Sequence, residues 1–441
     1  MKLRNLLYAT MIACAFASCS NDDDPIDNGG DKGNTDATLS VKYEAPIITK
    51  SGNTTGEDNT IASLNVYVFN GTGENATLEA TGTLTAGTDS ESKNIAVKAG
   101  DKSVVVVANA TPSNITTLGS LYNATKEFGD TEKNGTISMN SRTYVVSVIA
   151  GETNYLGYKK TEAAGGNYLV PTEATGGDLN EGAVKLYRNV AKINLEKITV
   201  NTSGATNKYS NAKFYPTDVF VLHANKMTKI VGGAAPWAST EFTGEGQAWL
   251  GGPSNDDYTE WKGIVDEWLK KDEGNKVKKN YVNPYAGGFD AWTKSISVKF
   301  PQNGIGEKST WPEQTTGQQE VTSVDYFYAY ENTNANLNTL LVVKGKFVYG
   351  EDVDASKFPE RYYSVSVGHD GMGAAVTPPT GGSARSEESG VLRNLQYNIA
   401  LTIQGPGWET PFGPDGGENT ALDVKVQVVD FSYVSQNVTI E

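Results

Sequence analysis

The chain has 441 residues and a formal net charge of -15, and its 38% hydrophobic content is enough for folded cores. Because 52 acidic residues outnumber 37 basic ones, it lacks the positive surplus that nucleic-acid binding requires, and we expect no nucleic-acid partner. The cysteines are Cys14 and Cys19, so the body of the chain has no disulfide framework and no cysteine-ligated zinc site. The chain has two histidines, which is too few for most forms of histidine-dependent catalysis.

The first residues have the parts of a secretory leader. Lys2 and Arg4 form a short basic region, and residues 6–17 form a mainly apolar stretch that ends in small residues before Cys19. The stretch is too short to cross about 30 Å of hydrocarbon, so we interpret residues 1–18 as a signal peptide. The segment resembles a bacterial lipoprotein signal, which implies lipidation of Cys19 with palmitate. An ordinary signal peptide followed by a soluble linker is the alternative.

Residues 19–37 contain almost nothing to bury and read as a flexible tether. The acidic run 20–24 resembles the export tag that follows the lipidated cysteine in surface lipoproteins of Bacteroidia. Residues 27–36 lack the glycine placement and the terminal glutamate of a calcium loop, which favours the tether.

From residue 38 onward, apolar and polar residues alternate, and Gly, Asn, Asp and Pro interrupt the pattern at short intervals. This is typical of antiparallel β-structure. Leu39, Val41 and Tyr43 open the series, and we expect further strands at 61–69, 103–108, 144–148, 155–158, 184–187, 190–200, 218–224, 324–330, 340–348, 362–367, 397–403 and 422–431.

The pattern predicts an all-β fold with two tandem antiparallel β-sandwich domains and minor helices. We place the domain boundary at Asn189, between two expected strands. The N-terminal domain then comprises residues 51–189, preceded by a first strand in 38–50, and the C-terminal domain comprises residues 190–441.

One stretch departs from the β pattern. Between residues 257 and 271, apolar residues recur at helical spacing, with acidic residues early and lysines late, which predicts a short amphipathic helix. The surrounding region is rich in tryptophan: Trp237, Trp249, Trp261, Trp268, Trp292 and Trp311. Exposed tryptophans can stack on sugar rings, but tryptophans at helical spacing more often pack in or over a core.

The sequence offers little for catalysis, and we predict no enzyme, no catalytic residue, no metal site and no cofactor. It has no paired histidines of the zinc type, no Walker loop and no serine nucleophile elbow. The glycine-rich run 368–373 has the wrong spacing for a dinucleotide fingerprint and reads as a turn. We interpret Glu351, Asp352 and Asp354 as part of a solvated loop, and His223 as a structural residue of a strand.

The last residues, about 421–441, form a long apolar segment with strand character, although chain ends usually fray. Such a segment pairs with open sheet edges if it is exposed. We expect residues 422–429 to stay in the C-terminal domain and the following donor segment to be available to a neighbour, through Phe431, Tyr433, Val434, Val438 and Ile440. The alternative is that the whole segment stays in its own domain.

Several segments together resemble the type V fimbrial pilins, the fimbrillin family of Bacteroidia. They follow the family's order along the chain and are 61–71, 99–100, 104–109, 155–158, 393–407 and 434–439. The region 230–320 matches poorly. The resemblance implies transthyretin-like sandwiches and a role as the major structural subunit of a fimbria.

The resemblance also implies a processing step. Fimbrillins are exported as outer-membrane lipoproteins, and an Arg- or Lys-specific protease then removes the leader together with the first strand. Here that strand carries Leu39, Val41, Tyr43 and Ile47, and cleavage would fall between Lys50 and Ser51. Lys42 is a weaker candidate for cleavage because it lies inside the strand.

Loss of this strand would leave a groove that the C-terminal segment of another subunit fills by donor-strand exchange. The expected partners are copies of the chain, related fimbrial subunits, the outer membrane before processing, and surface ligands of a host or of other bacteria. The expected location is the cell surface. A non-polymerising glycan-binding lipoprotein and a tip or anchor subunit are the alternatives.

Overall fold

The computed structural model divides the chain into two compact units, Met1–Asn34 and Thr35–Glu441. All described residues belong to the second unit, and they are 36–44, 60–85, 91–133, 136–161, 163, 165–170, 184–203, 209, 211–235, 238–245, 247, 249–250, 300–313, 325–334, 338–351, 354–368, 390–408, 411, 422–425, 427–430 and 435–440. The expected signal peptide, Cys19 and the expected helix at 257–271 lie outside this part.

The first sheet has five strands and holds β1 (Asp36–Glu44) in its interior. Its other strands are β4 (Glu91–Lys98), β9 (Thr153–Leu156), β10 (Asn167–Tyr168) and β11 (Val184–Lys185). β1 begins at Asp36, earlier than the expected start at residue 38, because Asp36 and Ala37 already pair with β4.

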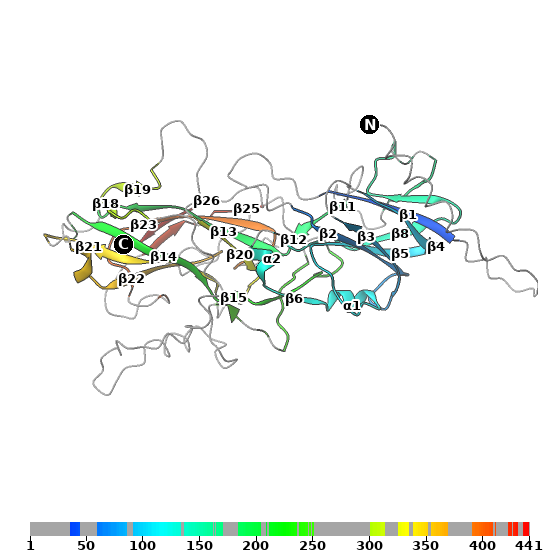
Figure 1. Ribbon diagram of the computed structural model, residues 1–441, viewed down its shortest axis with the longest axis horizontal. Coiled ribbons are helices and arrows are strands. Elements are labelled where there is room, and N and C mark those ends of the chain that lie inside the picture. The colour runs from blue at the N-terminus through cyan, green and yellow to red at the C-terminus, as the bar shows by residue number, and fades with distance from the viewer. Residues whose placement is uncertain are drawn as a thin grey trace, which may run out of the picture. The chain divides into compact units, whose positions relative to one another are not determined.

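The second sheet has six strands with β2 and β5 at its centre, drawn in blue and cyan in Figure 1. Its strands are β2 (Ser63–Asn70), β3 (Thr77–Thr85), β5 (Gly100–Ala108), β7 (Met139–Asn140), β8 (Tyr144–Val148) and β12 (Tyr187–Arg188). Because side chains alternate along a strand, Val66, Val68 and Val104 face the first sheet and form one core with Leu39 and Val41 of β1.

The other face of the second sheet is covered by helix α1 (Leu118–Tyr122). Phe69 and Val105 of the sheet share a core with Leu118 and Leu121 of the helix. The helix begins after Thr117, whose Oγ1 accepts a hydrogen bond from the Ser120 amide at 3.1 Å.

The later part of the chain forms a sheet of nine strands and a sheet of four. The larger sheet consists of β13 (Val190–Val200), β15 (Ala224–Asn225), β17 (Trp249–Leu250), β19 (Ser309–Trp311), β20 (Asp325–Tyr330), β23 (Leu395–Ile403), β24 (Leu422–Lys425), β25 (Gln427–Asp430) and β26 (Ser435–Ile440). The smaller sheet consists of β14 (Lys213–Leu222), β18 (Ile305–Gly306), β21 (Leu340–Val348) and β22 (Glu360–Ser366). The two sheets share one core, which includes Ile193, Leu395 and Ile399 from the larger and Phe214 and Val343 from the smaller.

Sheet membership changes at Asn189, because β12 ends at Arg188 in one sheet and β13 begins at Val190 in another. A two-stranded sheet connects the earlier and later parts by pairing β6 (Thr125–Glu127) with β16 (Met227–Lys229). Helix α2 (Asp130–Lys133) and the 3-10 helix η2 (Ala355–Lys357) complete the described elements.

The chain is an all-β protein, as predicted, and β8, β13 and β21 have the predicted bounds. Two strands differ in an informative way. β14 starts at Lys213, before the predicted residue 218, because a bulge between Pro216 and Asp218 lets the strand continue past the proline. It ends before Ala224 because His223 has a φ of 56°, which breaks the extended backbone. No helix among the described residues has the length and hydrophobicity to cross a membrane.

The sheets are not purely antiparallel. β1 pairs in parallel with β9 and with β11, and β23 pairs in parallel with β13 and with β26. Parallel neighbours need long connections, so these pairs join segments that are distant in the sequence. Both β1, the first described strand, and β26, the last, take part in such parallel pairs.

Candidate functional site

β1 has a partner along each of its backbone edges. On one edge it pairs antiparallel with β4, from Asp36 opposite Lys98 to Lys42 opposite Glu91. On the other edge it pairs in parallel with β9 over residues 38–41, and then with β11 at Tyr43 and Glu44. Removal of β1 therefore leaves two strands with unpaired backbone groups facing each other across a gap.

The β1 side chains complete the core between the first two sheets. Leu39 and Val41 are both 0% exposed and Ala37 is 4% exposed. Thr38 Oγ1 donates a hydrogen bond to Thr153 Oγ1 at 3.1 Å, and Nδ2 of the buried Asn154 donates to the Thr38 carbonyl oxygen at 3.1 Å. These contacts fix the register of β1 on β9.

Gly157 follows β9 and allows the chain to pass close to β1. Its φ is 81°, and a Cβ at this position would lie 2.2 Å from the Lys42 carbonyl oxygen and 2.9 Å from the Val184 nitrogen. Only glycine fits such a contact without movement of β1. The run 155–158 stands out in the sequence as a strand, but nothing local in it indicates this role of Gly157.

The other residues of the predicted removable strand are only partly described. Tyr43 lies in β1 opposite Val184, and nothing is described of its side chain. Ile47, Lys50 and Ser51 lie outside the described residues. Lys42 lies inside β1, where its backbone is paired on the β4 side and approached by Gly157.

In this chain, β26 also lies between a parallel and an antiparallel neighbour. It runs parallel to β23, with Val438 opposite Leu401 and Ile440 opposite Ile403. It runs antiparallel to β24, with Val438 opposite Val424. Phe431, Tyr433 and Val434 of the predicted donor segment lie outside the described residues.

β1 and β26 thus occupy similar places in their sheets. Each is an interior strand with parallel pairing along one edge and antiparallel pairing along the other, although the parallel edge of β1 is shared by β9 and β11 and that of β26 belongs to β23 alone. A strand that leaves the β26 position can form the same pattern of backbone hydrogen bonds in the β1 position, parallel to β9 and antiparallel to β4.

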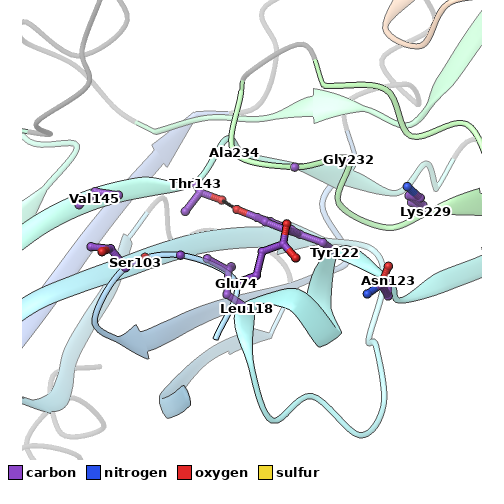
Figure 2. A pocket seen from close by; sticks show the side chains of 13 residues that line it. Glu74, Ser103, Leu118, Tyr122, Asn123, Thr143, Val145, Lys229, Gly232 and Ala234 are labelled. Atoms are coloured by element: carbon purple, nitrogen blue, oxygen red, sulfur yellow. Dashed lines mark hydrogen bonds between the residues drawn. The ribbon is translucent and has the colours of Figure 1, made fainter. Parts of the chain in front are cut away.

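A separate pocket of about 520 Å³ lies between α1, the second sheet and the segment that follows β16. Figure 2 shows Glu74, Tyr122, Asn123 and Lys229 among its lining residues, and the dashed line joins the Tyr122 hydroxyl to Thr143 Oγ1, 2.6 Å away. A carboxylate, an amine and an amide give this pocket capacity for small polar molecules. No tryptophan is among the described residues that line it.

The other residues that the sequence singled out for possible chemistry have contacts typical of structural residues. His223 is buried, and its Nδ1 lies 3.2 Å from the Asn338 carbonyl oxygen. Burial lowers the pKa of His223 to about 4, although the contact with that carbonyl raises it. Asp354 caps η2 by accepting a hydrogen bond from the Ser356 amide at 2.9 Å, while Asp352 and His369 lie outside the described residues.

Gly368 follows β22 with a φ of 81°, and a Cβ there would lie 2.1 Å from the Gly390 carbonyl oxygen. Gly368 lies in a turn, and residues 369–373 of the predicted turn lie outside the described residues. Trp249 lies in β17, and Trp311 lies in β19 with its ring 5.4 Å from that of Phe300. The described residues contain no group of three or more His, Cys, Asp or Glu that could hold a metal ion.

A buried polar network that the sequence did not predict lies where the early and late sheets meet. The Arg188 amide donates to Asn394 Oδ1 at 3.0 Å, Asn140 Nδ2 donates to Asn189 Oδ1 at 2.8 Å, and Arg393 Nε donates to the Ala238 carbonyl oxygen at 3.0 Å. These partners are far apart in the sequence, and the only sequence signal was the pair Arg393 and Asn394 in the family-like segment 393–407.

Comparisons with known proteins agree with the fold. The profile of the major fimbrial subunit protein (FimA) family matches residues 37–206. The chain is 25% identical to a major fimbrium subunit FimA type-2 of Porphyromonas gingivalis over 99% of this chain and 100% of the relative, and 25% identical to a FimA type-3 subunit over the same shares.

Two crystal structures share the fold. A cell adhesion protein of Parabacteroides distasonis, described as putative, superposes with a TM-score of 0.54 at 21% identity, over 92% of this chain and 98% of the other. A fimbrilin of Porphyromonas gingivalis W83 superposes with a TM-score of 0.50 at 19% identity, over the same shares. The two structures show the fold, and the match to the family profile and the full-length relatives support a FimA-like fimbrillin.

Proposed function

We propose that this chain is a structural subunit of a cell-surface fimbria and that it joins the next subunit by donor-strand exchange. The names of its full-length relatives support the first part, because they are major fimbrium subunits. The observation that carries the second part is the similarity of β1 and β26, each of which pairs in parallel along one edge and antiparallel along the other.

Removal of β1 would create a groove with high affinity for a strand. It would uncover the core beneath Leu39 and Val41, whose burial contributes about 1.5–3 kcal/mol each. It would also leave the edges of β4 and β9 unpaired on both sides of the gap. A strand that enters the groove restores both the apolar contacts and the backbone hydrogen bonds.

The donor in this proposal is the segment 431–440 of another copy. Before exchange, β26 pairs with β23 and β24 of its own chain, so donation requires its release from both. The backbone hydrogen bonds lost there are regained at β4 and β9 of the acceptor. Because the contact is head-to-tail, its repetition gives an open filament.

Proteolysis controls this exchange in the proposal. The chain is exported as a lipoprotein anchored in the outer membrane through Cys19, and an Arg- or Lys-specific protease cuts between Lys50 and Ser51. The position of Lys42 supports this choice of site, because its backbone is paired within β1. Until cleavage, β1 fills its own groove and prevents polymerisation.

We also propose the division into an N-terminal domain, 51–189, and a C-terminal domain, 190–441, based on the change of sheet at Asn189. The polar network around Arg188 and Asn394 would hold the two domains together along the shaft. A filament of such subunits would support adhesion to host or bacterial surfaces.

Cysteine pairs can test the exchange, because residues 51–441 contain no cysteine. Adjacent strands lie about 4.8 Å apart, which is compatible with a disulfide. Filaments that combine Thr153→Cys on β9 with Gln436→Cys or Asn437→Cys on β26 should give a ladder of disulfide-linked multimers. The unprocessed precursor should not.

The matched control pairs Thr402→Cys with Thr439→Cys, which lie opposite each other when β26 stays in its own chain. This pair should form an intrachain disulfide in the precursor and lose it in the filament. Filaments that retain the intrachain disulfide and give no ladder would exclude exchange of β26. N-terminal sequencing of the surface-exposed protein should give Ser51, and recovery only as lipidated Cys19 would favour a non-polymerising lipoprotein.

A further inference from the structure

Three reactive side chains meet at one end of the core between the first two sheets. Lys102 of β5 donates a hydrogen bond from Nζ to Asn70 Oδ1 at 2.7 Å, and the same Nζ lies 2.9 Å from Glu79 Oε2. Asn70 ends β2, and it faces Lys102 directly across the β2–β5 ladder. An amine, a carboxamide and a carboxylate are therefore in contact.

Glu79 reaches this position because β3 contains a bulge. Val68 pairs with Ala80 and Phe69 pairs with Leu78, so Glu79 has no residue opposite it in β2. Bulges redirect side chains in this way. Glu79 Oε1 accepts a hydrogen bond from the Lys98 amide, which leaves Oε2 directed at the lysine.

The lysine and the carboxylate are largely shielded from water, whereas Asn70, at the end of β2, is exposed. Lys102 is 0% exposed and the Glu79 side chain is 13% exposed. Glu79 Oε2 receives no aligned hydrogen bond from any described residue, although the lysine Nζ lies within salt-bridge distance. Burial of two charges costs free energy, which close contact between the two groups offsets.

We propose that Lys102 and Asn70 are joined by an intramolecular amide bond, and that Glu79 transfers the protons for its formation. The Glu79 carboxylate takes a proton from the lysine ammonium, and the neutral Nζ attacks Asn70 Cγ. The C=O electron pair moves to Oδ1 and forms a tetrahedral intermediate.

Protonated Glu79 then gives its proton to the asparagine Nδ2 and takes one from Nζ. Ammonia leaves as the C=O bond re-forms, and it takes up the remaining proton as ammonium, so that Glu79 is a carboxylate again. The net change converts an ammonium and a carboxamide into a secondary amide and an ammonium ion. It needs no oxidant and no second substrate.

The backbone holds the reacting groups in place. The Gly71 amide, next to Asn70, donates to the Asp101 carbonyl oxygen at 2.8 Å, and Ser103 Oγ donates to the Gly71 carbonyl oxygen at 3.0 Å. The attacked carbon is bonded to the oxygen that already contacts Nζ, about 1.2 Å away. Such fixed proximity raises the rate of intramolecular reactions strongly.

Lys344 provides an internal comparison. It lies 2.9 Å from Glu360 and 3.9 Å from Asp218, so both of its salt-bridge partners are carboxylates and neither can be attacked to release ammonia. The Lys102 site differs by its contact with an amide.

The bond would connect β2 to β5, the two central strands of the second sheet. It does not involve β1. If β1 is removed as in the proposed function, the bond would keep the rest of this core together until a donor strand arrives; the bond itself does not depend on that function.

Mass spectrometry of the denatured, trypsin-digested full chain tests the proposal. Trypsin does not cleave after an acylated lysine, so residues 99–126 should stay intact and be joined to residues 51–93, with the pair lighter by one ammonia. Cleavage after Lys344 should be normal. Wild-type protein that yields only the separate peptides 51–93, 99–102 and 103–126 would overturn the proposal.

The variant Glu79→Gln keeps the shape of the site and removes the proton carrier. It should give the separate peptides, as should Lys102→Met, which lacks the amine. A full yield of the joined peptides from Glu79→Gln would exclude Glu79 as the proton carrier. Filament formation can be scored on the same samples, so loss of the bond and loss of assembly are separate results.

Discussion

Truncation of Leu39 should separate the stability of the precursor from that of the filament. Leu39 is 0% exposed and lies in the core between the first two sheets. Replacement of a buried leucine by alanine costs about 2–5 kcal/mol, because transfer free energy is lost and a cavity remains. Leu39→Ala should therefore destabilise the unprocessed precursor by about that amount. The filament should be unaffected, because Leu39 has been removed with β1.

Two measurements are needed. Unfolding of the purified precursor in urea is monitored by circular dichroism, and dissociation of isolated filaments is measured on heating in detergent. Leu64→Ala is the matched control, since Leu64 is 1% exposed in the same core but lies in β2, which both forms retain. The control should weaken the precursor and the filament alike. If Leu39→Ala weakens filaments as much as Leu64→Ala does, β1 remains in the assembled subunit and the exchange mechanism fails.

Three further predictions concern single residues. Gly157→Ala should destabilise the precursor by at least the 1–3 kcal/mol of a strained backbone, because its φ is 81° and its Cβ would meet the Lys42 carbonyl oxygen; an unchanged urea midpoint would contradict this contact. Lys50→Ala should abolish removal of the first strand, whereas Lys42→Ala should leave it unchanged, as read from the N-terminal sequence of the surface protein; the opposite result would move the cleavage site. Burial lowers the pKa of His223 to about 4 and raises the pKa of Glu196 to about 7. The contribution of His223 to the unfolding free energy is therefore lost as the pH falls from 6.5 to 4, and the contribution of Glu196 is lost as the pH rises from 4.5 to 7. Each loss amounts to at most about 3 kcal/mol. His223→Asn should leave a protein whose unfolding free energy decreases as the pH rises through this range, and Glu196→Gln one whose unfolding free energy increases; parallel pH profiles for the two variants would refute the assignment.

The alternation of apolar residues was sufficient to locate most strands. β8, β13 and β21 have the bounds predicted from it, because a two-residue period is a local property of a half-buried strand. β3 and β4 were missed, since β3 consists largely of Thr, Ala and Gly with only two leucines, and the apolar residues of β4 are confined to the short run Ile95 to Val97. The start of β14 was missed because Pro216 interrupts the pattern, although a bulge absorbs it.

The sequence by itself determined the all-β class, the apolar faces of the first and last strands, and the resemblance to fimbrillins. Only the tertiary structure decided which strands are neighbours, and thus that β1 and β26 each pair in parallel along one edge and antiparallel along the other. It also decided the contact of Lys102 with Asn70 and Glu79, which depends on strand register and on a bulge. The physical reason is that alternation records only whether a side chain faces a core. Pairing and register depend on the chain as a whole, because strands that are distant in the sequence share the same backbone hydrogen bonds.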